Sequence, residues 1–297
     1  MDALLADDIM EKIKKKYGPN VRLSFEPNGG NLGDNFITAS CIMALDRSGL
    51  RWSMLNGRSL ESKEFDVIVY GGGGNLVPQY NGAASFIDRV NRAGKPLVVL
   101  PHTIRAHAGT LSKIVDGMVF CRELRSYQFM MDIIGLRESH VEIFLAHDMA
   151  FSIRLDMCGM WTVKDLVVAT RRDVPEHRSL YAFRRDNEGK NHVLAKYGRN
   201  VDLSVASATT GSDKSAILVQ CACFLGAIAR YDRIFTDRLH ISIAGAILGV
   251  ETYLFDNNYG KNFHVYKFSM EHRFDLVRYF ESVEEFPMKE ELFERQN

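Results

Sequence analysis

The sequence predicts an α/β protein made of two Rossmann-like domains that face a cleft. In the first half of the chain, short strands rich in Val, Ile and Leu alternate with segments of helical periodicity about five times, as in a doubly wound parallel sheet. A second series of strands and helices begins after about residue 160. The length of 297 residues allows two domains of ordinary size. We therefore expect an N-terminal domain over residues 1–160 and a C-terminal domain over residues 161–297.

The first half should begin with a short amphipathic helix over residues 1–18. The expected strands that follow are 21–25, 66–70, 95–100, 116–121 and 140–145, and the expected helices are 36–47, 84–92 and 126–134. Polar side chains stand where these strands end: Asp34, Asn75, His102, Arg122 and Asp148. Because the carboxyl ends of parallel strands share one edge of a sheet, these side chains can meet in space.

Two glycine-rich turns follow strands in this half, at 27–35 and at 71–75. Each can serve a backbone turn that needs positive φ, or let a ligand approach the backbone closely. Neither has the spacing of a Walker loop or of a dinucleotide-binding turn. The candidate floor for a ligand consists of Asn35, Gly73, Gly74, Asn75 and His102. Asp34 is either the N-cap of the following helix or a carboxylate directed at substrate.

The second half is expected to continue with a strand at 165–170 and a polar, basic surface loop over 176–198, near an acceptor site. A strand at 201–205 and a long apolar helix at 214–230 should follow. The tail over 270–297 is acidic and helical in pattern, and its helix is a candidate for packing back on the first domain.

The stretch from Arg233 to Asp256 reads as strand, turn, helix and strand. Thr236 or Asp237 is the expected N-cap, and Gly249 the glycine that ends the helix. Arg238 and His240 would then stand in the first helical turn, at the carboxyl end of a parallel strand, where backbone N–H groups favour an anion. They can be solvated surface residues, but cations beside a positive helix end are unfavourable without an anionic ligand.

Lys261 follows the last strand of this unit and would face the same edge. The cleft would then gather three cations, Arg238, His240 when protonated and Lys261, from the second half. Arginine gives planar, bidentate contacts to carboxylate or phosphate, and lysine acts as a point charge. This set of residues suits a small substrate that carries two or three negative charges.

Composition narrows the class of protein. Lys plus Arg and Asp plus Glu both number 37, so bulk charge gives no sign of a nucleic-acid partner. No segment is apolar for the 18 or more residues that a membrane span needs, and the N-terminal stretch lacks a signal-peptide pattern. Five scattered cysteines fit reduced thiols in a cytoplasmic protein. The nine histidines lack zinc-site spacing, so no metal is expected.

With these residues in view, the chain resembles the polysaccharide pyruvyl transferase family. The matching pieces stand in the family's order between about residues 28 and 266 and comprise Asn31–Asn35, Gly71–Leu76, Pro101–Ile104, Cys121–Glu123 with Ser126, Asp148–Phe151, Thr236–Ala244 and Asn257–Asn262. The sequence departs from the family at His102, where many members have Gln, and over residues 176–198, which differ from many members.

The resemblance implies a fold similar to the GT-B glycosyltransferases. It also implies transfer of the pyruvyl group of phosphoenolpyruvate, a co-substrate rather than a cofactor, to two hydroxyls of one sugar. The products would be a cyclic ketal and phosphate, and the acceptor an exopolysaccharide or cell-surface precursor, often lipid-linked at the inner face of the membrane. By this resemblance Arg122, Arg238, His240 and Lys261 would hold the donor. Asp34 would be the base, and His240 either a proton donor or a phosphate ligand.

Two alternatives belong to other classes. A GT-B glycosyltransferase could bind a nucleotide sugar at the same helix start, with Asp256 or Glu251 on the ribose, although the number of cations exceeds what a diphosphate needs. A catalytically silent sugar-binding relative is disfavoured by the intact set of polar residues. The acceptor sugar, the ketal stereochemistry and the oligomeric state do not follow from the sequence.

Overall fold

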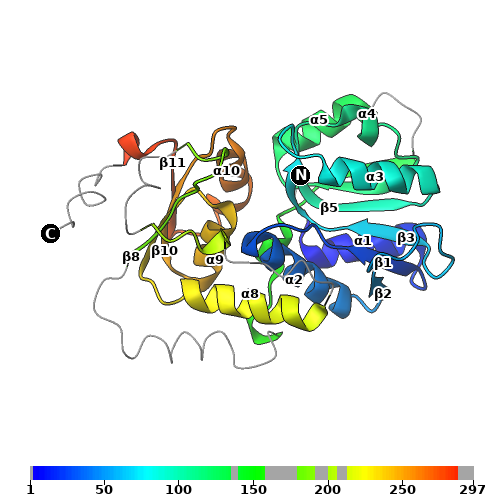
Figure 1. Ribbon diagram of the computed structural model, residues 1–297, viewed down its shortest axis with the longest axis horizontal. Helices are drawn as coiled ribbons and strands as arrows, with labels where there is room; N and C mark the ends of the chain where they lie inside the picture. The colour runs from blue at the N-terminus through cyan, green and yellow to red at the C-terminus, as the bar shows by residue number, and fades with distance from the viewer. Residues whose placement is uncertain (1–2, 135–139, 158–178, 191–199, 206–212, 287–297) are drawn as a thin grey trace. The chain divides into compact units, whose positions relative to one another are not determined.

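The computed structural model describes residues 3–134, 140–157, 179–190, 200–205 and 213–286 of the chain (Figure 1). The described residues divide into two compact units. The first takes those within 1–30, 34–157 and 208–221, and the second those within 31–33, 158–207 and 222–297. Both units are built on parallel sheets with helices, which confirms the predicted α/β class. The predicted boundary at residue 160 lies outside the described residues.

A parallel seven-stranded sheet forms the centre of the first unit, in the order β2-β1-β3-β5-β6-β7, with β4 also paired to β5. The strands are β1 (Arg22–Glu26), β2 (Arg51–Met54), β3 (Val67–Tyr70), β4 (Gly73–Leu76), β5 (Leu97–Ile104), β6 (Asp116–Cys121) and β7 (His140–Leu145). From β1 the chain winds outward to β2 on one side and to β3 on the other. In open α/β sheets, ligands bind at the carboxyl ends of strands beside such a reversal.

Helices cover both faces of this sheet (Figure 1). On one face, Ile68, Leu97 and Val99 of the sheet pack with Phe86 of α3 and Met130 of α5 in an apolar core. The helices of this face are α3 (Gly82–Ala93), α4 (Ala108–Leu111) and α5 (Leu124–Ile134), and those of the other are α1 (Ala6–Tyr17) and α2 (Leu32–Arg47). Two short 3-10 helices, η1 (Met149–Ser152) and η2 (Leu155–Met157), follow β7.

Four parallel strands form the sheet of the second unit, in the order β11-β10-β9-β8. They are β8 (Ser179–Ala182), β9 (Arg233–Thr236), β10 (Glu251–Phe255) and β11 (Val277–Phe280). One face is covered by an aromatic core that includes Phe183, Phe235, Tyr253, Phe255 and Phe286. Because the strands run the same way, their carboxyl ends bring the polar residues that follow β8, β9 and β10 to one edge.

The remaining helices of the described chain are α8 (Lys214–Ile228), α9 (Leu239–Leu248) and α10 (Lys261–Val265), with short helical turns η3 (Leu203–Val205), η4 (Tyr266–Met270) and η5 (Val283–Glu285). The boundary between the two units falls inside α8, after Cys221. No helix in the described ranges is both long enough and apolar enough to cross a bilayer.

Several sequence predictions for the second half are wrong. The expected loop over 176–198 contains strand β8, and the expected strand at 201–205 is a 3-10 turn. The expected helical tail contains β11 instead, because Val277–Phe280 finds a parallel partner in β10. The strand expected at 165–170 and residues 287–297 of the tail lie outside the described residues. In the first half the prediction missed β2 and β4, each only four residues long.

The start of α9 also differs from the prediction. Its N-cap is Arg238, not Thr236 or Asp237, and Arg238 makes no side-chain cap. The Thr236 hydroxyl accepts from the Arg238 N–H at 2.9 Å and donates to the Ala182 carbonyl, so it ties β9 to β8. Asp237 accepts a backbone N–H from another segment instead of capping the helix. The predicted stop at Gly249 is confirmed, with φ of 68°.

Candidate functional site

A polar cluster stands at the carboxyl ends of β1 and β3, where the winding of the first sheet reverses. The Asn75 amide nitrogen donates to Asn28 Oδ1 at 2.6 Å, and Asn75 Oδ1 lies 2.8 Å from His102 Nε2. The Tyr70 hydroxyl also donates to Asn28 Oδ1, at 3.2 Å. Asn28 and His102 are buried and Asn75 is half-buried, so Asn75 is the member of the cluster that solvent reaches.

The glycines beside this cluster are explained by close packing. Gly73 has φ of 153°, and a Cβ at this position would lie 2.1 Å from the Asn28 amide nitrogen. A side chain at Gly73 would therefore displace Asn28 and break the cluster, whatever its chemistry. Gly74 is half-buried and follows directly. The structure thus brings Gly73, Asn75 and His102 together with Asn28, and their role as a floor for a ligand stays a prediction.

His102 is neutral in this setting. Burial, and after it the charge of Arg122, lowers its pKa to about 3. A neutral imidazole can position the Asn75 amide by hydrogen bonding, but it holds no proton to give to a substrate near neutral pH.

Asp34 and Asn35 lie in the first turn of α2, which begins at Leu32, so Asp34 is not the N-cap. The Asp34 carboxylate turns back toward the preceding turn: a Cβ on Gly30 would lie 2.0 Å from Asp34 Oδ2. An acid at the third helical position commonly reaches back in this way. The Asn35 side chain donates to that of Gln220. Both residues are half-buried, and the roles of Asp34 as a base and of Asn35 as part of the floor for a ligand stay predictions.

Arg122 follows β6 and is fully buried. Its Nη1 lies 2.6 Å from Asp148 Oδ2, and its Nε donates to the Thr103 hydroxyl at 2.8 Å. Asp148 Oδ1 accepts from the Ala150 N–H at 2.9 Å, so the pair joins the ends of β5 and β6 to η1. Two of the predicted strand-end residues, Arg122 and Asp148, are therefore partners. The predicted role of Arg122 as a donor ligand stays a prediction.

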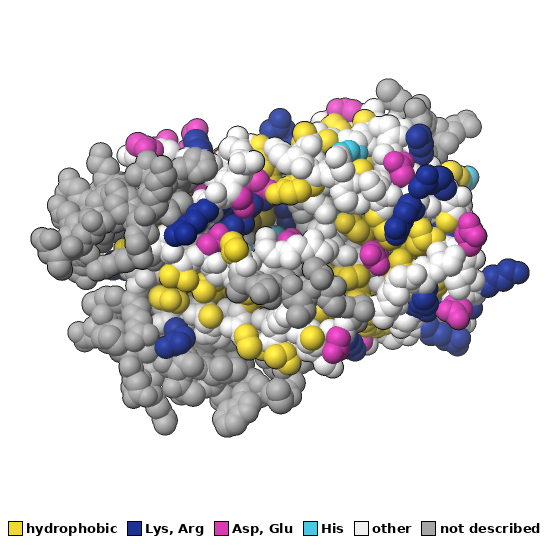
Figure 2. Space-filling view, viewed as in Figure 1, with side chains coloured by type: hydrophobic (Ala, Val, Ile, Leu, Met, Phe, Trp, Pro, Cys, Tyr) yellow, Lys and Arg dark blue, Asp and Glu magenta, His cyan; other side chains and the backbone are white. Residues whose placement is uncertain are grey.

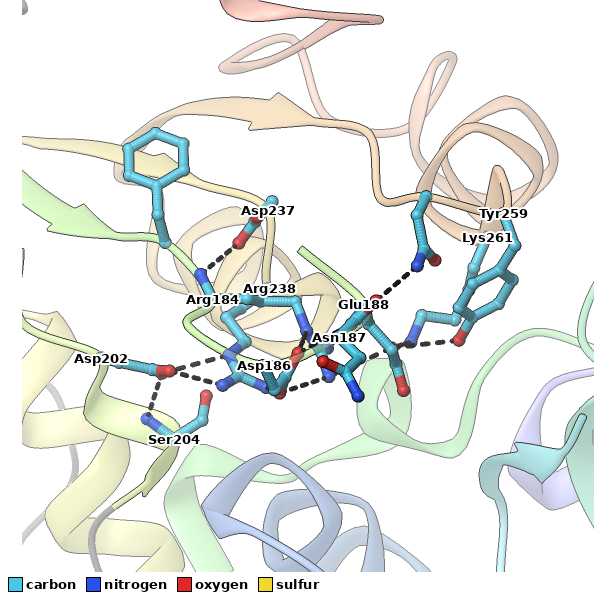
Figure 3. Close-up of polar contacts among 12 residues, drawn as sticks. Arg184, Asp186, Asn187, Glu188, Asp202, Ser204, Asp237, Arg238, Tyr259 and Lys261 are labelled. Atoms are coloured by element: carbon cyan, nitrogen blue, oxygen red, sulfur yellow. Dashed lines mark hydrogen bonds and ion pairs between the residues drawn. The ribbon is translucent and has the colours of Figure 1, made fainter. Parts of the chain in front are cut away.

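In the second unit, Arg238 is held by carboxylates (Figure 3). Its Nε donates to Asp202 Oδ1 at 3.1 Å and its Nη2 to Asp202 Oδ2, which is a bidentate pair. Arg238 Nη1 lies 3.4 Å from Asp186 Oδ2. The Arg238 and Asp202 side chains are only 6% and 8% exposed, whereas that of Asp186 is 45% exposed. Asp202 is thus a fixed partner and Asp186 a solvent-facing one.

Asp186 also holds a second guanidinium. Arg184 is the second residue after β8 and donates from Nε to Asp186 Oδ1 at 2.8 Å and from Nη2 to Asp186 Oδ2 at 2.9 Å. The Arg184 side chain is 8% exposed, and its Nη2 also lies 3.1 Å from Glu188 Oε2. Burial acts to raise the pKa of Asp186, but the hydrogen bonds and charge of Arg184 and the charge of Arg238 outweigh it and lower that pKa.

Lys261 stands at the same edge, as the first residue of α10. Its Nζ lies 3.1 Å from Glu188 Oε2, and the Tyr259 hydroxyl donates to the same oxygen at 3.1 Å. The Lys261 and Glu188 side chains are 10% and 7% exposed. Glu188 therefore links Lys261 to Arg184, and one network of ionic contacts connects the ends of β8, β9 and β10 (Figure 3).

Asp237 lies under this network. It is fully buried, and its Oδ1 accepts from the Arg184 N–H at 2.8 Å. Burial raises its pKa to about 6, against the opposing effects of that hydrogen bond and of the charges of Arg184 and Arg238. A carboxyl group that titrates near neutral pH can carry a proton beside an anion site.

His240 lies in the first turn of α9 and is half-buried. It follows Arg238 by two residues. Within the second unit, Arg238 and His240 both stand at the start of α9. Arg238 and Lys261 belong to the same network of ionic contacts, and each is bound to a carboxylate. Sequence reasoning missed Arg184, Asp186, Glu188 and Asp202. The apolar run Leu180–Phe183 before Arg184 was a usable signal for a strand that ends in a cation.

The two carboxylates considered for a nucleotide ribose have partners in the protein. Glu251 accepts from the Tyr253 hydroxyl at 2.6 Å and lies 3.2 Å from Arg233 Nε. Asp256 Oδ1 accepts from the backbone of Asn257. Among the described residues, no group of three His, Cys, Asp or Glu side chains is placed to hold a metal ion. On the face drawn in Figure 2, Lys and Arg are interspersed with Asp and Glu.

Comparisons with known proteins agree with this architecture. The model of a family described as polysaccharide pyruvyl transferase matches residues 2–259. A crystal structure of a functionally uncharacterised protein from Klebsiella pneumoniae subsp. pneumoniae NTUH-K2044 is similar, with a TM-score of 0.74 and 24% identity. The match covers 93% of this chain and 98% of that one, and it shows a shared fold. The comparison with curated proteins found no match.

Proposed function

This chain belongs to the polysaccharide pyruvyl transferase family, and from that premise we propose that it transfers the pyruvyl group of phosphoenolpyruvate to a sugar. The acceptor would be a unit of an exopolysaccharide or cell-surface glycan precursor. Two hydroxyls of one sugar would form a cyclic ketal, and phosphate would be released. The family match over residues 2–259 is the observation that carries the proposal.

The second unit supplies the chemistry that this donor needs. The central carbon of phosphoenolpyruvate carries a carboxylate and, through an oxygen atom, a phosphate. Binding of these two neighbouring anionic groups needs several cations close together. Arg238 and Lys261 stand at the carboxyl edge of one sheet, and their side chains are 6% and 10% exposed. Charge-assisted contacts in such a poorly solvated place are stronger than on an open surface.

The reaction requires a proton and a nucleophile on neighbouring carbons. A proton must reach the methylene carbon, and a sugar hydroxyl must attack the central carbon. Phosphate then leaves with its bonding electron pair, and the second hydroxyl closes the ring. Of the two hydroxyl protons, one balances the proton added to carbon and the other leaves with phosphate.

We assign His240 as the proton donor or a phosphate ligand, and Asp34 as the base for the sugar hydroxyl. Histidine commonly serves as a general acid in catalysis, which suits it to the first role. Asp34 is half-buried in the first turn of α2, so part of the residue is exposed to solvent. We assign Arg122 to the binding of phosphoenolpyruvate. The floor of the site, on which the substrates would lie, consists of Asn35, Gly73, Gly74, Asn75 and His102.

The partners follow from the same proposal. They are phosphoenolpyruvate and a free or lipid-linked oligosaccharide, and the latter would place the protein at the inner face of the membrane. No cofactor or metal is needed for the chemistry, since the donor already carries its leaving group. Similarity to GT-B glycosyltransferases stays a prediction.

Phosphate release tests the function directly. Protein, phosphoenolpyruvate and a panel of bacterial glycan precursors are combined, phosphate is measured, and products are examined by mass spectrometry. We expect phosphate only where an acceptor gains one pyruvyl ketal, and none with His240→Ala. Sugar transfer from UDP-glucose or GDP-mannose to the same panel, without phosphate release from phosphoenolpyruvate, would contradict the proposal.

A further inference from the structure

Asp186 stands between two arginines that each have another carboxylate partner. Arg184 binds it through Nε and Nη2 at 2.8 and 2.9 Å, and Arg238 Nη1 lies 3.4 Å from its Oδ2 (Figure 3). The two arginine side chains are 8% and 6% exposed, but that of Asp186 is 45% exposed. A half-exposed carboxylate therefore occupies the space that two buried guanidinium groups face.

Movement of Asp186 out of this space takes away the carboxylate that Arg184 and Arg238 share. Asp202 neutralises Arg238 through a bidentate contact, and Glu188 is shared between Arg184 and Lys261. The buried Asp237 also lies beside both arginines, and its Oδ1 accepts from the Arg184 N–H at 2.8 Å. Two poorly solvated guanidinium groups that lose a shared carboxylate partner attract another anion with oxygens in a plane, which arginine recognises best.

Asp186 is also the carboxylate that can leave at least cost. Its side chain already contacts water, so its release exposes little new surface and restores part of its hydration. Asp202 and Glu188 are 8% and 7% exposed, and their release would leave buried cations unpaired. The backbone N–H of Glu188 donates to Asp186 Oδ1 at 3.1 Å and is the one further contact that movement of Asp186 breaks among those described.

We propose that Arg184 and Arg238 together form a binding site for one anionic group of the substrate, and that Asp186 occupies this site until the anion displaces it. Resting on the proposed function, the anionic group is the carboxylate or phosphate of phosphoenolpyruvate. Arg184 is then a donor-binding residue beside Arg238. Asp186 sets the affinity for the donor by competing with it.

The proposal predicts opposite effects from two residues that touch each other. Asp186→Asn keeps the shape of the side chain but removes its charge, so the arginines hold it less tightly and the anion displaces it more easily. In the original protein the apparent dissociation constant is raised, because only the molecules in which Asp186 has left the site can bind the anion. We expect the variant to bind about 10-fold more tightly, since this competition is weakened. Arg184→Gln removes a charge-assisted contact and should weaken binding by about 10-fold. A purely structural contact would weaken binding in both variants.

The chain contains a matched control. Arg154 and Asp156 have the same spacing and the same bidentate geometry, with Nε–Oδ1 at 3.0 Å and Nη2–Oδ2 at 2.8 Å. Both side chains are more than half exposed, and neither is part of the network at β8, β9 and β10. Asp156→Asn should leave the dissociation constant within about 2-fold of the original value, since exposed pairs contribute little.

Titration calorimetry with phosphoenolpyruvate, and separately with inorganic phosphate, tests the site without an acceptor. Tighter binding in Asp186→Asn and weaker binding in Arg184→Gln support it. Unchanged or weaker binding in a folded Asp186→Asn overturns it, even if the enzyme makes ketal. If phosphate shows these opposite effects but phosphoenolpyruvate does not bind, the anion site stands and the proposed donor falls.

Discussion

The backbone of Gly33 lies against the imidazole ring of His240. A Cβ at position 33 would lie 2.9 Å from His240 Nδ1 and 3.0 Å from His240 Cβ. The first distance is shorter than real Cβ contacts and the second is tighter than most of them, so a side chain here requires the ring to move. Gly33 and His240 belong to the same unit, and Gly33 is the second residue of α2, so the absence of a side chain at position 33 leaves room for the imidazole of His240.

Replacement of this glycine should therefore act on the reaction more than on folding. In Gly33→Ala the ring of His240 must shift, and we expect kcat to fall roughly 10- to 100-fold because small displacements of a reacting group are costly. Gly29→Ala is the control from the same turn, since no heavy atom lies within 4 Å of a Cβ there. Equal loss of activity in both variants would remove the contact with His240 from the explanation.

Variants of His240 separate its two assigned roles. His240→Gln should lower turnover by about 10²- to 10⁴-fold if the imidazole gives a proton in the transition state. The dissociation constant of phosphoenolpyruvate distinguishes the roles: it stays unchanged for a proton donor and rises for a phosphate ligand. His272→Gln, with a side chain that is 87% exposed, is the control. Normal turnover in His240→Gln would exclude both roles.

Arg122 offers a test of a structural against a ligand role. Because Asp148 is fully buried, Arg122→Met leaves a carboxylate without its cation and should lower the free energy of unfolding by about 3–5 kcal/mol. Arg22→Met removes an exposed pair with Asp66 and should leave the free energy of unfolding nearly unchanged. Chemical denaturation measures both.

The double variant Arg122→Met with Asp148→Leu removes both buried charges and should recover much of this loss. If that protein still binds phosphoenolpyruvate as the original does, Arg122 serves the fold alone. Lost binding in the stable double variant would support the donor role.

His102 should make stability depend on pH. Its pKa is about 3 in the folded protein, against an ordinary value of about 6.5 when unfolded. Between these values the unfolded chain binds one more proton, so stability falls as pH decreases from about 6.5, by about 1.4 kcal/mol per pH unit at most. In His102→Gln the side chain cannot titrate, so the free energy of unfolding should depend less on pH between 4 and 6.5. Chemical denaturation of both proteins at several pH values measures this. Parallel curves would contradict the buried, neutral imidazole.

Local sequence patterns were sufficient for the elements that pack through their own periodicity. The strands at Asp116–Cys121 and His140–Leu145 have the predicted bounds, and the strand–helix–strand unit from Arg233 was predicted with its stop at Gly249. Ser179–Ala182 was missed because the polar residues after it dominate the local composition. Its strand character comes from parallel pairing with β9.

The site was predictable only in part, for a physical reason. Sequence places cations at the ends of strands, but it does not show which carboxylates fold onto them from other segments. Asp202 reaches Arg238 across 36 positions and Glu188 reaches Lys261 across 73. The charge of the anion site is set by these distant contacts, and so it became visible only in three dimensions.

The most direct test of the account is the binding of phosphoenolpyruvate beside UDP-glucose and GDP-mannose at equal concentrations, followed as thermal stabilisation. A ligand at about 100 times its dissociation constant adds roughly 2.7 kcal/mol to the free energy of unfolding. The account predicts stabilisation by phosphoenolpyruvate alone. It also predicts none in the double variant Arg238→Met with Asp202→Leu, which removes the anion contact without an unpaired charge. Stabilisation by a nucleotide sugar and none by phosphoenolpyruvate would contradict it.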